Sequence, residues 1–308
     1  MDTSIVITGV SGFLGRYIAR YLSSQGFDVY GVDSSPSENA PTSYLRKYFS
    51  LRLPDNEFNA LVKQVSPSVL IHCAGRASVG LSVEKPSSDF YSNTLLTFDV
   101  LDSLRLNSPS CKFILLSSAA VYGNPSQLPV NEAELRFPIS PYGYHKHLCE
   151  ELCLEFANVY GMSTASSRIF SAYGPGLRRQ VLWDICRKAL TEPSISLLGT
   201  GQESRDFIHA IDVAKALFAL IKSAPMNGEA YNLASGREVT IKQLSELVTE
   251  NLGVEKEVRF DGIIPVGNPL NWRADISRIK ALGFVPSVSL ERGVKTFLNW
   301  CQAELIGC

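Results

Sequence analysis

The sequence predicts an α/β fold in which a doubly wound parallel sheet carries a smaller, interleaved C-terminal lobe. Short apolar runs alternate with amphipathic segments through residue 170, which is the pattern of parallel strands joined by crossover helices. A glycine-rich turn follows the first apolar run. Beyond residue 170 the alternation gives way to loops rich in glycine and proline, which indicates a second unit of different construction.

The first thirty-odd residues form the clearest unit. An apolar strand leads into a turn that holds Gly9, Gly12 and Gly15, and an amphipathic helix and a second strand ending at Asp33 follow. Free N–H groups and the positive dipole end of the helix attract a pyrophosphate, which glycines allow to approach closely. Asp33 stands where a carboxylate can bind both hydroxyls of an adenosine ribose. We therefore expect a dinucleotide site, and Asp33 favours NAD because it would repel a 2′-phosphate.

The next elements follow the same alternation. Strands are expected near residues 48–51, 69–75, 112–118 and 164–170, and helices near 57–65, 87–107 and 142–160. Ligands of such sheets gather beyond the carboxyl ends of the strands. Gly75, Ser118 and Ser171 all stand at such ends, so we expect them near one site.

The second half is expected to form most of the lobe. Loop signals surround a helix near 181–191, and Asp206–His209 with the helix that follows is interpreted as a return to the main sheet. This interpretation divides the chain into a dinucleotide-binding domain at 1–170, with a return segment near 205–235, and a lobe that is mostly 171–308 and binds substrate.

Composition narrows the classes of function. The formal net charge is −1, which leaves no electrostatic footprint for nucleic acid. No apolar run approaches the roughly 20 residues of a membrane span. The N-terminus leads straight into a predicted strand, so we expect no signal peptide. The seven cysteines include no Cys-x-x-Cys pair. We expect a cytoplasmic protein with reduced thiols, no metal site and no nucleic-acid or membrane partner.

One pair of residues suggests the chemistry. Tyr142 and Lys146 are four residues apart and so share one face of the helix predicted there. A cation beside a phenol favours the phenolate, which can act as a general base toward a sugar hydroxyl. Ser118, at its strand end, can hydrogen-bond the same substrate oxygen.

Motifs along nearly the whole chain resemble a known family. They are Thr8–Gly15, His72–Gly75, Asn93, Ser117–Gly123, Ser140–Lys146, Arg168–Gly176, Ser204–His209 and Arg273–Ser277. In this order they make the chain similar to the extended short-chain dehydrogenases/reductases, within the NAD-dependent nucleotide-sugar epimerase/dehydratase group. The resemblance implies a Rossmann domain and a smaller substrate-binding lobe.

The resemblance also implies a role for each matching residue. The catalytic residues would be Ser118, Tyr142 as acid/base and Lys146. The residues that bind NAD would be Gly9, Ser11, Gly12, Phe13, Leu14, Gly15, Asp33, Cys73, Ala74, Gly75, Asn93, Tyr142, Lys146 and Phe170. The residues that bind the nucleotide sugar would be Ser118, Ala119, Ser171, Arg205 and Arg273.

Several positions depart from the family pattern. Ala119 and Ala120 replace the pair that contains the acid driving water elimination in dehydratases, so dehydratase and decarboxylase activities are not expected. Ser171 replaces an asparagine that contacts substrate. Ser50 replaces an acid near the adenine, and Pro265 replaces an arginine that binds the substrate diphosphate.

Three functions remain open from the sequence. The first is an NAD-dependent epimerase that inverts C4 of a nucleotide sugar through a 4-keto sugar. The second is an NAD(P)H-dependent nucleotide-4-keto-sugar reductase, which Ala119 and Ala120 fit equally well. The third is a non-catalytic dinucleotide sensor, which would need none of Ser118, Tyr142 and Lys146.

The partners expected from the resemblance are a nucleotide sugar and a second copy of the chain. The sugar could be a UDP-, dTDP- or GDP-hexose. Leu148, Leu152 and Phe156 give the helix of Tyr142 an apolar face, which would serve a homodimer or pack inside the monomer.

Overall fold

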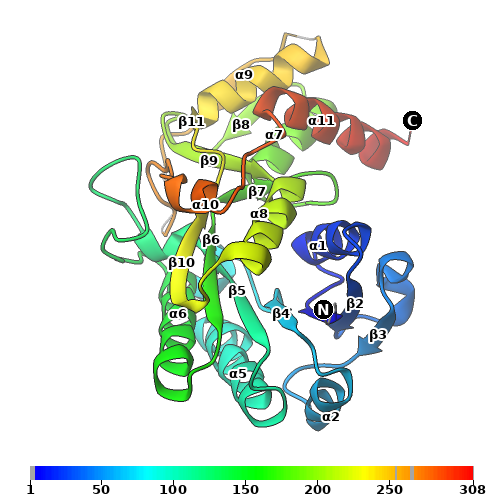
Figure 1. Ribbon diagram of the computed structural model, residues 1–308. Coiled ribbons are helices and arrows are strands. Elements are labelled where there is room, and N and C mark those ends of the chain that lie inside the picture. Colours follow the sequence, from blue (N-terminus) through cyan, green and yellow to red (C-terminus); the bar gives the residue numbers. More distant parts are fainter. Residues whose placement is uncertain (1–3, 254, 264–266, 308) are drawn as a thin grey trace.

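A parallel sheet of seven strands forms the centre of the protein. The computed structural model describes residues 4–253, 255–263 and 267–307. The strand order is β10-β6-β5-β4-β1-β2-β3, with every neighbouring pair parallel (Figure 1). Their bounds are β1 Ser4–Thr8, β2 Asp28–Asp33, β3 Lys47–Ser50, β4 Val69–His72, β5 Lys112–Ser118, β6 Thr164–Ile169 and β10 Asn227–Leu233. The predicted doubly wound sheet is confirmed.

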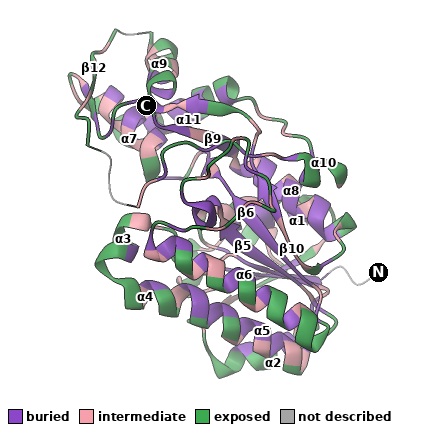
Figure 2. Ribbon diagram, turned by 90° about the vertical axis from the view of Figure 1, so that its left-hand side faces the viewer, coloured by how far each residue is buried: buried purple, intermediate pink, exposed green. Residues whose placement is uncertain are grey.

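Helices cover both faces of this sheet, so its centre is buried (Figure 2). Successive side chains of a strand point to opposite faces. Accordingly Ile5 and Ile7 belong to one apolar cluster and Val6 to another. The first cluster includes residues of α1 (Phe13–Ser24) and α8 (Ala210–Ser223). The second includes residues of α2 (Asn56–Val65), α5 (Leu96–Asn107) and α6 (Pro141–Tyr160).

The helix predicted near 87–107 contains an irregular turn. It begins as α4 (Pro86–Phe90), continues through the π-helical turn η3 (Tyr91–Leu95) and ends as α5. Such wide turns insert one extra residue and often occur at functional sites. Here the turn carries Asn93, whose side chain is buried.

The C-terminal lobe has its own sheets and its own core. One sheet has the order β11-β9-β7, and a second pairs β12 with β8. Their bounds are β7 Ser171–Tyr173, β8 Ile195–Leu197, β9 Ser204–His209, β11 Glu238–Thr240 and β12 Val258–Phe260. The lobe helices α7 (Gln180–Thr191), α9 (Ile241–Leu252) and α11 (Leu290–Ile306) share one apolar cluster with these strands.

One sequence prediction within the return segment was wrong. Asp206–His209 lies in β9, which pairs with β7 and β11 rather than joining the main sheet. The chain returns to the main sheet through α8 and β10. The buried side chain of Asp206 explains why this strand lies in the lobe. The buried Asp206 carboxylate accepts hydrogen bonds from the backbone of Ser235, Gly236 and Ala274, which a strand packed by apolar helices on both faces could not supply.

The remaining short elements are connectors. They are the helices α3 (Val79–Glu84) and α10 (Ser277–Ala281) and the single turns η1 (Ser37–Asn39), η2 (Thr42–Tyr44) and η4 (Ala119–Tyr122). Across the described ranges, none of the helices combines the length and apolar character that crossing a bilayer requires.

Candidate active site

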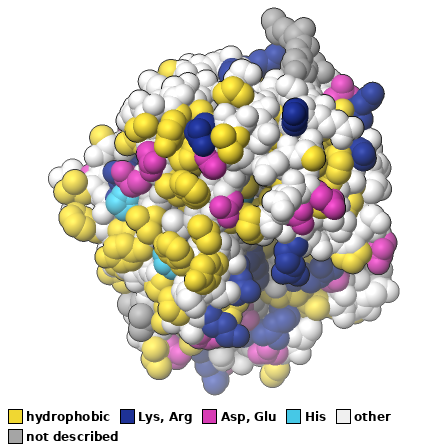
Figure 3. Space-filling model, turned by 90° about the horizontal axis from the view of Figure 1, so that it is seen from below, with side chains coloured by type: hydrophobic (Ala, Val, Ile, Leu, Met, Phe, Trp, Pro, Cys, Tyr) yellow, Lys and Arg dark blue, Asp and Glu magenta, His cyan; other side chains and the backbone are white. Residues whose placement is uncertain are grey.

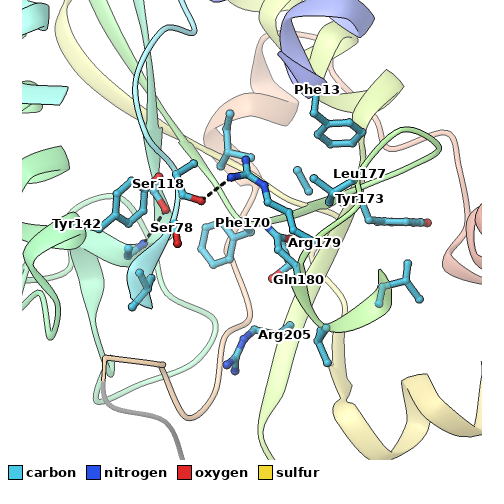
Figure 4. Close-up of a pocket in the computed structure, with 18 of the residues that line it drawn as sticks. Phe13, Ser78, Ser118, Tyr142, Phe170, Tyr173, Leu177, Arg179, Gln180 and Arg205 are labelled. Carbon is cyan, nitrogen blue, oxygen red and sulfur yellow. Dashed lines mark hydrogen bonds between the residues drawn. The ribbon is translucent and has the colours of Figure 1, made fainter. Parts of the chain in front are cut away.

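A cavity of about 720 Å³ lies between the carboxyl edge of the main sheet and the C-terminal lobe. Its walls come from the glycine turn after β1, the loop after β4, the end of β5, the first turns of α6 and the segments around β7 and β9. Figure 4 shows Tyr142, Ser78 and Ser118 on one side of it, opposite Tyr173 and Leu177. The cavity thus occupies the edge where ligands of such sheets bind.

The glycine turn is so tightly packed that larger side chains do not fit. Gly9 has φ +70°, and a Cβ there would lie 2.6 Å from the backbone nitrogen of Ala74. A Cβ on Gly15 would lie 2.3 Å from the carbonyl oxygen of Gly9. The helix α1 begins at Phe13 with no side-chain cap and no acidic residue in its first turn. Its N–H groups and positive dipole end are therefore open to an anion.

Asp33 ends β2 with a fixed orientation. Its Oδ2 accepts a hydrogen bond of 3.0 Å from the backbone N–H of Ser11, and its Oδ1 accepts one of 3.0 Å from that of Ser35. Asp33 and Ser11 are not part of the cavity lining. Two backbone N–H groups therefore orient the Asp33 carboxylate, which is not part of the cavity wall.

The three predicted catalytic side chains line the same cavity. Tyr142 and Lys146 are one turn apart on α6, and both are more than nine-tenths buried. The Lys146 ammonium donates a hydrogen bond of 3.0 Å to the Leu116 carbonyl. The Ser118 hydroxyl oxygen accepts one of 3.2 Å from the Ala120 N–H. The Ser118 hydroxyl can still donate a hydrogen bond to another oxygen in the cavity.

A buried polar network that the sequence did not indicate supports this wall. The Arg168 guanidinium forms an ion pair of 2.7 Å with Glu150, one helical turn beyond Lys146. Ser117 donates a hydrogen bond of 2.5 Å to the same carboxylate, and Arg168 donates one of 2.8 Å to the Tyr122 hydroxyl. Burial raises the pKa of Tyr122, so its hydroxyl stays protonated. The network joins the end of β5 to α6.

The loop after β4 and the π-helical turn meet behind the cavity. Cys73 and Gly75 line it, while Ala74 and Asn93 do not. Asn93 donates a hydrogen bond of 3.2 Å to the Asp89 carbonyl, and its Oδ1 would lie 2.6 Å from a Cβ on Gly75. A side chain at residue 75 would therefore collide with Asn93.

His72, next to this loop, has a structural role. Its Nδ1 lies 2.8 Å from the Thr8 hydroxyl oxygen. Burial, with a smaller effect of the Lys146 charge, lowers the pKa of His72 to about 3. The imidazole is neutral at physiological pH.

The predicted substrate-binding residues divide into two groups. Ser171 and Arg205 line the cavity, as does Phe170 from the predicted NAD site. The Arg205 guanidinium carbon lies 5.6 Å from the centre of the Trp272 ring, and burial lowers the pKa of Arg205 to about 10. The guanidinium therefore remains charged and faces the cavity.

The structure does not bring Ala119 and Arg273 into the lining. Ala119 is fully buried behind Ser118, at the start of the turn η4. Arg273 is exposed and donates a hydrogen bond of 3.3 Å to the Gly236 carbonyl. Neither residue lines the cavity, and their substrate contacts remain predictions. Pro265 lies outside the described residues.

Sequence reasoning missed two arginines of the cavity. Arg76 follows Gly75, and Arg179 precedes α7. The available signal was the Arg178-Arg179 pair, one residue after the Gly-Pro-Gly loop, but nothing in the sequence says which of the two faces the cavity.

Comparisons with known proteins show which family the chain matches. Residues 5–234 match the NAD dependent epimerase/dehydratase family. The chain is 29% identical over 303 residues to a putative UDP-glucose 4-epimerase of Methanocaldococcus jannaschii, covering 97% of this chain and 98% of that one. It is 27% identical over 315 residues to a UDP-glucuronate 4-epimerase of Thermodesulfobacterium geofontis, covering 97% and 96%.

A solved structure has the same fold over the full length. It is the UDP-glucose 4-epimerase of Thermus thermophilus in complex with NAD, with a TM-score of 0.89 and 25% identity. The match covers 98% of this chain and 100% of that one.

Proposed function

We propose that this chain, which belongs to the NAD-dependent epimerase/dehydratase family, interconverts UDP-hexoses that differ in configuration at C4. One observation carries the proposal: Ser118, Tyr142 and Lys146 line a single cavity together with an open, glycine-cradled helix N-terminus. The similar proteins named as UDP-glucose and UDP-glucuronate 4-epimerases support both UDP and C4.

The residues of the first unit fit NAD. The glycine turn leaves no room for a Cβ beside the open N-terminus of α1, where the pyrophosphate would bind. The Asp33 carboxylate would accept hydrogen bonds from the adenosine ribose hydroxyls, and the backbone N–H groups of Ser11 and Ser35 hold it in place. Cys73, Gly75 and Phe170 would surround the nicotinamide end. When bound, NAD supplies reversible hydride acceptance, and it ends each cycle unchanged.

The catalytic side chains would remove one proton from the sugar and later return it. Tyr142 Oη removes the proton of the sugar 4-hydroxyl as C4 is oxidised, and returns it after the keto-sugar has presented its other face. Lys146 lines the same cavity and would bring a positive charge to the reacting oxygens. Ser118 donates a hydrogen bond to the same oxygen and keeps it oriented.

The diphosphate of the substrate would lie toward the C-terminal lobe. Arg205 is held there by Trp272 and by the Leu270 carbonyl at 3.2 Å. The helix α7 begins at the same cavity, with no side-chain cap and no acidic residue in its first turn. A guanidinium and an open helix N-terminus both favour a diphosphate.

The 4-keto-sugar reductase is the less favoured function, because the similar proteins are named epimerases. Proton NMR of the purified protein with UDP-glucose, and separately with UDP-glucuronate, tests the proposal. We expect the C4 epimer of one of them to appear without net consumption of NAD or NADH. Absence of an epimer from both sugars, or net oxidation of NADH with a 4-keto sugar, would overturn it.

The homodimer belongs to the same proposal. Tyr91, Leu95 and Phe98 on the helix of η3 and α5, with Tyr144 and Leu148 on α6, are all at least 40% exposed. Figure 3 shows hydrophobic side chains gathered on the underside of the molecule, the side on which α5 and α6 lie in Figure 1. A patch of this kind marks a protein interface. Phe156, by contrast, is buried within the monomer.

A further inference from the structure

The loop before α7 is fixed against the first turn of α1. The Tyr17 hydroxyl donates a hydrogen bond of 2.9 Å to the Pro175 carbonyl. A Cβ on Gly176 would lie 3.9 Å from the Phe13 ring, and Phe13 packs against the cluster that contains Leu177. The backbone that leads to Arg179 therefore lies beside the open N-terminus of α1, although the two segments are far apart in the sequence.

The Arg179 side chain then reaches across the cavity. Figure 4 shows its guanidinium pointing from the lobe toward the wall of Ser78 and Ser118. Its Nη1 donates a hydrogen bond of 3.1 Å to the carbonyl of Ala77, in the loop after β4. Arg179 thus directly precedes the open N-terminus of α7, and the backbone that leads to it lies beside the open N-terminus of α1.

The acids of the cavity wall do not neutralise this guanidinium. Asp184 pairs with Arg187 at 3.1 Å and with Lys188 at 2.7 Å. Glu203 accepts hydrogen bonds from Thr200 and from the backbone of Gly201. In the part of the chain that the structure describes, Arg179 has a neutral carbonyl as its hydrogen-bond partner and forms no ion pair.

Its neighbour Arg178 has a different orientation and a charged partner. It points outward, pairs with Glu304 at 2.5 Å and lies over the Trp300 ring. Its charge is satisfied within the lobe, and it is not part of the cavity lining. The two adjacent arginines therefore provide a matched comparison between a structural cation and a cation that faces the ligand.

We infer that Arg179 binds a diphosphate, exchanging the Ala77 carbonyl for a phosphate oxygen. This phosphate oxygen could belong to either of two diphosphates. The open N-terminus of α1 suits the diphosphate of NAD. The N-terminus of α7 and Arg205 suit the diphosphate of the UDP-sugar. A guanidinium between the two diphosphates would strengthen ligand binding where the C-terminal lobe meets the main sheet. This inference rests on the proposed function only in requiring that the wild-type protein binds NAD and UDP.

Titration calorimetry of the purified full chain with NAD and, separately, with UDP tests the inference. The variants are Arg179→Ala, Arg179→Lys and, as the matched control, Arg178→Ala. We expect Arg179→Ala to weaken one or both ligands about 10- to 100-fold, the range for a charged hydrogen bond. Arg179→Lys should restore part of this loss, and Arg178→Ala should leave both dissociation constants within about threefold of the wild type.

The pattern identifies the source of the phosphate. A loss for NAD alone assigns Arg179 to the cofactor, a loss for UDP alone to the substrate, and a loss for both to a bridge between them. Unchanged affinity for both ligands would overturn the inference, as would equal losses in Arg178→Ala or loss of folding in Arg179→Ala by circular dichroism. Absence of binding by the wild type would instead refute the proposed function.

Discussion

At the scale of single residues, the proposed chemistry depends on the hydroxyl of Tyr142. This group lines the cavity, and Tyr142 is buried in the first turn of α6. Tyr142→Phe removes the proton acceptor and keeps the ring, so we expect turnover to fall about 10²- to 10⁴-fold while NAD still binds. Initial rates and NAD titration of the same preparation measure both quantities.

Tyr144 offers a matched control for this substitution. It lies on the same helix, is 56% exposed and does not line the cavity. Tyr144→Phe should keep the wild-type rate. Wild-type activity in Tyr142→Phe would remove Tyr142 from the mechanism.

The stability of the fold should depend on pH through His72. Its folded-state pKa is about 3, against 6.5 when unfolded, so only the unfolded chain takes up this proton between these values. Stability is therefore lost as the pH falls below 6.5. Relative to His72→Gln, the wild type should lose about 2 kcal/mol of unfolding free energy between pH 7 and pH 5. Urea unfolding of both proteins at pH 7 and pH 5 measures these free energies. An equal change with pH in the wild type and in His72→Gln would contradict the prediction.

Residues whose roles depend on local pattern were predictable, and the others were not. Tyr142 and Lys146 share a helix face by their spacing alone. Arg168 could not be paired with Glu150 from the sequence, because the pair forms only when β6 packs beside α6. Arg179 likewise acquires its direction from a loop that packs on a helix far away in the sequence.

At the scale of elements, the turn between β1 and α1 sets the geometry of the cofactor site. A Cβ on Gly15 would lie 2.3 Å from a backbone oxygen, so α1 must shift in Gly15→Ala. Overpacking of this kind costs about 1–3 kcal/mol. We expect a lower melting temperature and an NAD affinity at least about tenfold weaker, measured by calorimetry.

A second glycine-to-alanine substitution separates packing from helix propensity. A Cβ on Gly80, within α3, meets no atom within 4 Å. Gly80→Ala should therefore keep or raise the melting temperature. If Gly15→Ala is as stable as Gly80→Ala and binds NAD normally, the turn is less tightly packed than described.

Most element boundaries followed from apolar periodicity, with one informative exception. Periodicity predicted a single helix near 87–107, whereas the structure has a π-helical turn at Tyr91–Leu95. The apolar residues divide between an exposed set that includes Leu95 and Phe98 and a buried set that includes Leu101 and Leu104, a division that periodicity did not predict. That turn buries Asn93 against Gly75.

At the scale of the whole molecule, the interleaving of sheet and lobe was only partly predictable. The sequence indicated a return to the sheet, but not that β10 makes it and β9 stays in the lobe. The choice depends on which backbone groups surround Asp206, and these come from residues 235–274. Contacts over such separations leave no periodic signal.

The apolar patch on α5 and α6 predicts association of two chains. Tyr144→Asp combined with Leu148→Asp should convert a dimer into a monomer of 33.8 kDa, because two charges would be buried without partners. Light scattering after size exclusion measures the mass. Leu135→Asp, at a residue that is 69% exposed outside these helices, should remain dimeric. A monomeric wild type would contradict the prediction.

The most direct test of the account follows one atom through the reaction. UDP-glucose carrying deuterium at C4 is incubated in ordinary water with the wild-type protein, and its C4 epimer is analysed by NMR and mass spectrometry. Hydride transfer from C4 and back within one cavity predicts that the epimer retains its deuterium at C4. Replacement of that deuterium by solvent hydrogen, or its appearance in free NADH without an epimer, would contradict the account.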